Sequence, residues 1–174
     1  MRRTTALTSG IEKCLQALKD EGKIKVLGTS IHDRVRAGQL ARDSILDALM
    51  IRYNAKHPGA ELDIFPHLQA RDPIIMSYTA TSWGQLLRPI SGIEMPPWPV
   101  PGETPAPPPL TAELCYRFCL SSPSVHVTWM APKTREQLDA NLAALRLGSL
   151  PTDEEAWVRA YGRQVKARKK LPFI

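Results

Sequence analysis

Apolar residues follow two patterns that alternate along the chain. Helical spacing predicts helices between residues 9 and 22, over 34–43, 62–69 and 110–122, from near Lys133 onward, and over 151–170. Short apolar runs predict strands over 24–28, 44–52, 73–80 and 124–130, although a helix stays open as the alternative for 44–52. Such alternation implies a parallel sheet covered by helices. The sequence therefore predicts an α/β fold with four strands, and the 73–80 run is of the kind that sheets bury on both faces.

Several predicted helices carry start or break signals. The S/T-x-x-E/Q form of a capping box occurs three times, at Ser9 with Glu12, Thr134 with Gln137, and Thr152 with Glu155. Pro66 weakens the helix predicted over 62–69, because an interior proline removes a backbone donor and kinks the helix. The last helix is expected to pack through Trp157, Tyr161 and Val165.

Segment 124–141, SVHVTWMAPKTREQLDAN, joins a predicted buried strand to a helix start that suits phosphate. Pro132 ends the strand, and the helix begins near Lys133. Unpaired backbone N–H groups in a helix's first turn attract anions, and Lys133 and Arg135 add two positive charges there. The alternative is an ordinary capped amphipathic helix without a ligand.

Four segments, taken together, resemble the aldo-keto reductase family of nicotinamide-dependent (β/α)8 barrels. The segments, in chain order, are 12–34, 47–57 with MIRYNAKH, 78–87 with YTATSWGQLL, and 131–141 with APKTREQLDAN. They are similar, in order and spacing, to the family's strands five to eight. A complete barrel needs about 250 residues, and this chain has 174. The resemblance therefore implies a half TIM barrel of about four βα units plus a C-terminal helix.

The resemblance implies NAD(P)H-dependent carbonyl reduction, with this chain supplying the cofactor-binding half. The family's catalytic aspartate, tyrosine, lysine and histidine lie on its first four strands, which have no counterpart here. We therefore assign no catalytic residue and expect a truncated oxidoreductase that is inactive alone. The alternative is a non-catalytic half-barrel that binds NADP or another phosphate ligand and works by pairing with a partner, either a second copy or a complementary half-barrel, through its exposed sheet edges.

The resemblance also implies a set of cofactor-binding residues: Ser30, Tyr78, Thr79, Gly84, Leu86, Lys133, Thr134, Gln137 and Asn141. Ser30 matches a serine that bonds the nicotinamide carboxamide, and Tyr78 matches the aromatic residue that stacks on the ring; a buried strand aromatic is the plainer interpretation of Tyr78. Ile31, Met50 and Ala140 depart from the family's frequent Asn, Gln and Glu. Positive charge near Lys133 favours NADP, with NAD as the alternative.

Composition and charge bear on the number of domains, on nucleic-acid binding and on localisation. With 43% hydrophobic residues, 1–174 suits a single domain, interrupted by a proline-rich loop over 92–109. The net charge of +6 is modest, and the basic run near the C-terminus is expected to be a solvated helix face rather than a nucleic-acid site. Three cysteines without a secretory signal indicate the cytoplasm, and no run has the length of a membrane span.

Isolated polar and sulfur-bearing residues give no catalytic or metal motif. His57 and His67 lack a third ligand at metal spacing, so we expect no metal site. Neighbouring His32 and Asp33 are expected to have a surface role just after a strand. Cys115 and Cys119, one helical turn apart, are expected to be small apolar residues on a packing face.

Overall fold

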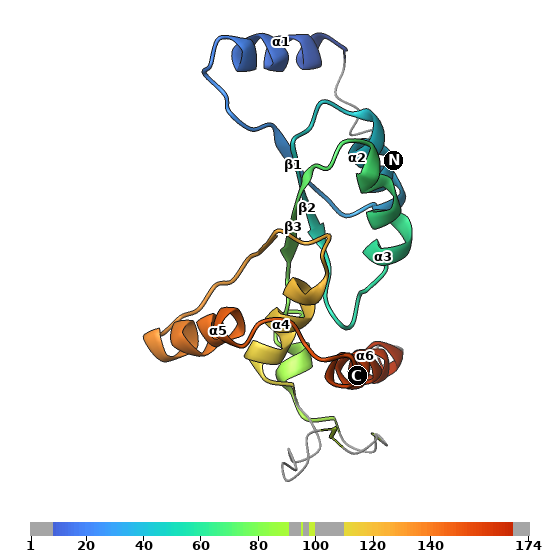
Figure 1. Ribbon diagram of the computed structural model, residues 1–174, viewed down its shortest axis with the longest axis vertical. Helices are drawn as coiled ribbons and strands as arrows, with labels where there is room; N and C mark the ends of the chain where they lie inside the picture. Colours follow the sequence, from blue (N-terminus) through green and yellow to red (C-terminus); the bar gives the residue numbers. More distant parts are fainter. Residues whose placement is uncertain (1–8, 91–94, 96–97, 100–109, 169–174) are drawn as a thin grey trace, which may run out of the picture.

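A four-stranded parallel sheet organises the molecule, which a computed structural model describes over residues 9–90, 95, 98–99 and 110–168 (Figure 1). The strands are β1 (Gly28–Ile31), β2 (Ala48–Arg52), β3 (Ile74–Tyr78) and β4 (Val127–Thr128). They lie side by side in chain order, and every pair is parallel. The sheet does not close on itself, so the predicted α/β fold with an open half-barrel is confirmed.

Helices connect the strands. The elements are α1 (Ser9–Asp20), α2 (Arg34–Asp43), α3 (Ala60–Asp63), the 3₁₀ helices η1 (Phe65–Ala70) and η2 (Gln85–Leu87), α4 (Ala112–Ser121), α5 (Arg135–Leu147) and α6 (Thr152–Ala167). The single helix predicted over 62–69 is wrong, because the chain breaks at Ile64 and continues as η1 with a proline in its first turn. The capping box predicted at Thr152 is also wrong, since Pro151 is the N-cap and makes no side-chain cap bond.

The first strand lies later in the chain than predicted. Residues 24–27 stay outside the ladder, and β1 pairs with β2 only from Gly28 onward. Leu27 is instead held by Asp47: the Leu27 N–H donates to Asp47 Oδ2 at 2.9 Å, and the Leu27 carbonyl accepts from the Asp47 N–H at 2.8 Å. Lys19 of α1 donates to the same carboxylate at 2.7 Å. Asp47 therefore anchors both α1 and the entry to β1.

The two faces of the sheet differ in burial. Side chains alternate along a strand, and on one face Leu49, Ile51 and Ile75 are fully buried. On the other face Ile74 is 39% exposed and Val127 is 43% exposed. The expectation that 73–80 is buried on both faces is therefore wrong in the described residues, and so is the expectation that 124–130 is a buried strand. This second face, which would be the interior of a closed barrel, is partly exposed in the part of the chain that the structure describes.

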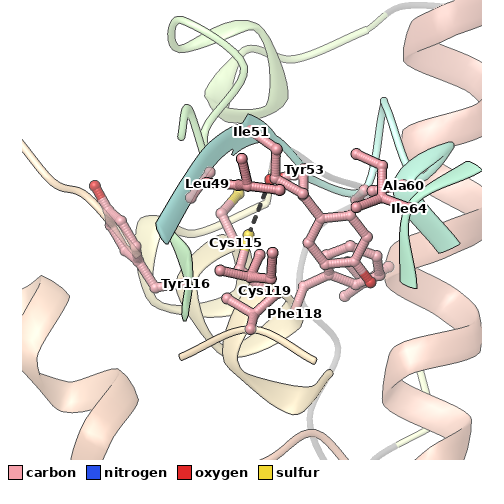
Figure 2. Close-up of a cluster of buried hydrophobic side chains, with 14 of the residues drawn as sticks. Leu49, Ile51, Tyr53, Ala60, Ile64, Cys115, Tyr116, Phe118 and Cys119 are labelled. Atoms are coloured by element: carbon pink, nitrogen blue, oxygen red, sulfur yellow. Dashed lines mark hydrogen bonds between the residues drawn. The ribbon is translucent and has the colours of Figure 1, made fainter. Parts of the chain in front are cut away.

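The covered face packs against α3 and α4 (Figure 2). Tyr53, directly after β2, stacks on Phe118 at 5.5 Å between ring centroids, and its carbonyl accepts from Cys119 Sγ at 3.3 Å. Burial raises the pKa of the Cys119 thiol to about 12 and also raises the pKa of Cys115. Both cysteines are buried. They are packing residues, as predicted.

A polar clamp holds α6 against this core. The Tyr53 hydroxyl donates to Glu61 Oε1 at 2.6 Å, and the guanidinium of Arg159 donates to both oxygens of Glu61 at 2.7 and 3.1 Å. Arg159 also bonds Glu155 at 2.8 Å and lies over the Phe118 ring at 4.8 Å. The predicted packing face of α6 is confirmed, since Trp157, Tyr161 and Val165 are buried.

Two further expectations concern the proline-rich segment and membrane-spanning helices. The proline-rich segment 92–109 lies outside the described residues except for Met95, Trp98 and Pro99. The Trp98 ring meets Trp157 edge-on at 4.8 Å between centroids. Of the helices that the structure describes, none combines the length and apolarity needed to cross a membrane.

Candidate functional site

Parallel strands present their carboxyl ends at one edge of the sheet, where α/β proteins place binding sites. Arg52 at the end of β2 is in register with Tyr78 at the end of β3, and Ser77 is in register with Thr128. The segments that follow β1, β2, β3 and β4 therefore start beside one another. The expected cofactor residues Ser30, Tyr78 and Thr79 belong to this edge.

The residues on the open face at this edge form a mixed polar and apolar surface. Ser30 is exposed, and the register places it beside Met50, which is beside Met76. Ile31 is part of the alternate set that faces the helices. Met50 offers only a thioether, a weak acceptor, where a glutamine could donate and accept. Ser30 is thus the remaining strong hydrogen-bonding group of the three positions expected to meet a carboxamide.

Tyr78 is paired with a residue from the far side of β2. Its hydroxyl lies 3.1 Å from His32 Nδ1, and the two rings are perpendicular with centroids 5.6 Å apart. Burial raises the pKa of Tyr78, and the positive charge of Arg52 opposes that shift. The tyrosine is half-buried on the open face, so it is not the fully buried strand aromatic of the plainer interpretation. Its ring is held at the edge where the strands end.

The loop after β2 fixes the backbone on which Thr79 sits. Asn54 is fully buried, its Nδ2 donates to the Thr79 carbonyl at 2.8 Å, and its Oδ1 accepts from the His57 N–H at 2.9 Å. The Tyr53 N–H donates to the Tyr78 carbonyl at 3.1 Å. The Thr79 hydroxyl oxygen is buried and has no hydrogen-bond partner among the described residues. Buried hydroxyl groups normally have a hydrogen-bond partner, so this group is available to a ligand.

A strained turn follows Thr79. Ser82, Trp83 and Gly84 have φ of 50°, 57° and 74°, three left-handed residues in succession. Each of the two non-glycine residues costs roughly 1–2 kcal/mol in this conformation, and such strain concentrates at functional sites. The Gly84 N–H donates to Thr81 Oγ1 at 3.3 Å, and the Leu86 N–H donates to the Thr81 carbonyl at 3.2 Å.

The turn therefore uses the amides that a ligand would otherwise meet. Leu86 is buried in the core. The backbone N–H groups of Gly84 and Leu86, the two expected cofactor residues of this turn, both donate to Thr81 within the turn. Trp83 is left 77% exposed beside them. A buried ammonium braces the turn from the loop after β2, since Lys56 donates to Gln85 Oε1. The structure thus gives Gly84 and Leu86 a shape-forming role.

The second group of expected residues lies at the start of α5. Thr134 is the N-cap, and its side chain accepts from the Gln137 N–H at 3.3 Å, so the Thr134 half of the predicted capping box is confirmed. The Gln137 side chain turns back and accepts from the Lys133 N–H at 2.8 Å. Lys133 and Arg135 are exposed, and Arg135 reaches Asp139 only at 3.9 Å. Two cations thus stand at an exposed helix N-terminus.

A carboxylate of the chain itself competes for this N-terminus. The pKa of Glu136 is lowered, first by its own backbone N–H and then by the Thr134 hydroxyl. An incoming phosphate would have to displace or tolerate this charge. Sequence patterns alone did not indicate the competition, because Glu136 matched the family pattern.

Asn141 lies elsewhere on α5. It is buried, and its Nδ2 contacts Met130 Sδ at 3.7 Å. It lines a pocket of about 210 Å³ between β4, α4 and α5. Its amide therefore faces the interior behind the helix start rather than joining Lys133, Thr134 and Gln137. In Figure 1 α5 lies to one side of the strands β1, β2 and β3.

Comparisons with known proteins give a likeness of fold. No protein-family model matches the sequence, and no curated protein matches it significantly. The holo form of the aldo-keto reductase AKR11C1 from Bacillus halodurans superposes with a TM-score of 0.66 at 20% identity, over 87% of this chain and 55% of that one. Its apo form gives 0.67 at 18% identity, over 91% and 58%. The chain thus spans less than two thirds of that reductase, and its fold matches part of that barrel.

Proposed function

We propose that this chain is the cofactor-binding half of an NAD(P)H-dependent carbonyl reductase of the aldo-keto reductase family. The observation that carries the proposal is the arrangement at the carboxyl edge of the sheet: Ser30 and Tyr78 on the open face, with Thr79 directly after β3. The likeness to one such reductase over most of this chain supports it. When bound, the nicotinamide cofactor would supply the hydride.

The chain's residues fit such a cofactor in part. Tyr78 offers a ring that His32 holds at the edge, and Ser30 offers an exposed hydroxyl. The unpartnered hydroxyl of Thr79 is suited to a phosphate oxygen if the side chain rotates outward. Lys133 and the start of α5 offer positive charge for a 2′-phosphate. This favours NADP over NAD.

No catalytic role is assigned to the described residues. Tyr78 is the tyrosine at the strand ends with the freest hydroxyl, but its raised pKa disfavours the anionic form, and its neighbour is a histidine ring. A general acid needs a group that lowers the barrier to losing its proton. The reaction is therefore proposed to require groups from outside this chain.

A second candidate function is pairing with a complementary half-barrel. The open face and the free sides of β1 and β4 favour it, because each edge strand has one neighbour in the described sheet. An added set of parallel strands could pair with both edges, cover the interior face and so close the barrel. We propose a second copy of this chain as the simplest such partner.

NADPH titration of the purified chain tests the first proposal. Tryptophan fluorescence is a suitable readout because Trp83 and Trp129 are exposed near the strand ends. We expect saturable quenching that Lys133→Ala weakens about tenfold. The matched control Lys25→Ala, an exposed lysine before β1, should leave the affinity unchanged. Absence of saturable quenching in folded wild-type chain, or equal loss in both variants, would reject the proposal.

A further inference from the structure

Arg52 is a half-buried cation on the open face. It is the last residue of β2, in register with Tyr78 on β3, and it shares its face with Met50 two residues earlier. The position is thus at the carboxyl end of two central strands. It was not among the residues that sequence patterns indicated.

Arg52 has no acidic partner among the described residues, whose ion pairs involve other cations. The contrast with other sheltered arginines is clear. Arg117 bonds Glu113 and Glu154, and Arg159 bonds Glu61 and Glu155. A guanidinium withdrawn from solvent normally has an anion to bond. Arg52 is therefore available to bind an anion from outside the described residues.

The neutral hydroxyl of Tyr78 lies on the strand next to this cation, at the same strand ends. Its charge acts on the Tyr78 hydroxyl, as the downward influence on that pKa shows. The Tyr78 hydroxyl is within 3.1 Å of His32, and Ser30 lies exposed on the adjacent strand. Met50 and Met76 continue the same face toward the middle of the sheet. The result is an apolar surface that ends in a guanidinium, with the Tyr78 side chain on the adjacent strand.

We propose that Arg52 binds the carboxylate of the carbonyl substrate, so that the site selects small 2-oxo acids over neutral ketones. The planar fork of a guanidinium matches the two oxygens of a carboxylate. The methionines accommodate the apolar remainder of the substrate. This inference rests on the proposed function, because it names the substrate class for the same edge of the sheet. The carboxylate is bound as a spectator group and no bond to it changes.

Binding of pyruvate to the 174-residue chain, compared with its neutral amide, tests the inference. The readout is the side-chain Nε–H resonance of Arg52 in a proton–nitrogen correlation spectrum, assigned by its loss in Arg52→Met. Each ligand is titrated with and without NADP⁺, into wild type, Arg52→Met, Arg52→Lys and the control Arg163→Met, an exposed arginine on α6. Backbone spectra of each variant report whether it is folded.

We expect pyruvate to shift the Arg52 resonance saturably and to bind about tenfold or more tightly than the amide. Arg52→Met should abolish this preference, Arg52→Lys should retain part of it, and Arg163→Met should retain all of it. Equal binding of the two ligands, a preference that survives in Arg52→Met, or no response to pyruvate would overturn the inference. A loss of NADPH affinity in Arg52→Met equal to the loss for pyruvate would also overturn it, because the bound anion would then be the cofactor's.

The outcome for this inference is separable from that for the proposed function. Pyruvate preference without NADPH binding would reject the cofactor proposal and keep the carboxylate site. NADPH binding without pyruvate preference would keep the cofactor proposal and reject the carboxylate site.

Discussion

The hydroxyl of Tyr78 lies 3.1 Å from Nδ1 of His32, which joins the end of β3 to the end of β1 across the intervening strand. Neither residue's backbone is paired with the other's strand, so the contact is made by side chains alone. It holds the tyrosine ring at the edge where the proposed nicotinamide would lie. His32 was expected to have only a surface role, and the structure gives it this contact as well.

Tyrosine ionisation provides the first prediction. Burial raises the pKa of each of the chain's four tyrosines, at positions 53, 78, 116 and 161, above the ordinary 10.0. As pH rises above about 10, the unfolded chain therefore loses tyrosine protons before the folded chain does. The contribution of the tyrosines to the free energy of unfolding should be fully present below pH 10 and should fall progressively above it.

Tyrosinate absorbance checks this directly. The native chain should titrate at higher pH than the same chain in concentrated guanidinium chloride, where the midpoint should be near 10. Coincident titration curves for folded and denatured chain would contradict the burial described here.

The carboxylate at the start of α5 gives the second prediction. Glu136→Gln removes a negative charge that uses the helix N-terminus. We expect NADPH to bind about two- to fivefold more tightly, corresponding to the usual worth of one charge at an exposed helix terminus. Glu12→Gln, a change of the same kind in α1, serves as the control and should not alter the affinity. Weaker binding in Glu136→Gln would mean that this helix start does not receive the phosphate.

A close backbone contact gives the third prediction. Gly162 of α6 lies against the loop after β2, and a Cβ there would stand 2.1 Å from the Ala55 carbonyl oxygen. Gly162→Ala must separate α6 from that loop, and we expect it to lower the free energy of unfolding by about 1–3 kcal/mol or more. Gly10→Ala is the matched control, because nothing lies within 4 Å of a Cβ at that position. This substitution should raise the free energy of unfolding by about 0.5–1 kcal/mol, since alanine favours the helix more than glycine does. Urea unfolding measures both. Equal effects of the two substitutions would contradict the described packing of α6.

The uncovered face gives the fourth prediction. Met76 lies on it, in register with Met50 and Val127. If a second copy covers this face, the wild-type chain should form a discrete dimer in size-exclusion chromatography with light scattering. Met76→Lys should weaken that association about tenfold or more, whereas Val35→Lys, on the outer side of α2, should not. A monomer at every concentration tested would reject self-pairing.

Locally determined elements were predictable from sequence. The bounds 34–43 of α2 are as expected, because Asp33 caps it through the Arg36 N–H at 3.0 Å and Ser44 ends it. The helices at both ends and the parallel four-stranded sheet also agree with the pattern of apolar positions. The capping box at Thr134 is likewise a property of four neighbouring residues.

Burial and cross-strand partners were not predictable in the same way. The apolar side chains of Ile74 and Val127 are typical of a buried sheet face. The sequence pattern does not indicate whether the residues that bury this face belong to the same chain. The His32–Tyr78 contact and the unpaired Arg52 depend on strand register, which brings distant residues together. The same holds for Glu136, whose competition for the helix start depends on its rotamer.

We propose that the strand ends and the start of α5 together bind a nicotinamide cofactor. Backbone proton–nitrogen correlation spectra of the chain, recorded during titration with NADP⁺, test it most directly. We expect saturable shifts at Ser30, Tyr78, Thr79 and Thr134, with α6 unaffected. Shifts confined to other regions, or a spectrum that NADP⁺ leaves unchanged while the chain is folded, would contradict it.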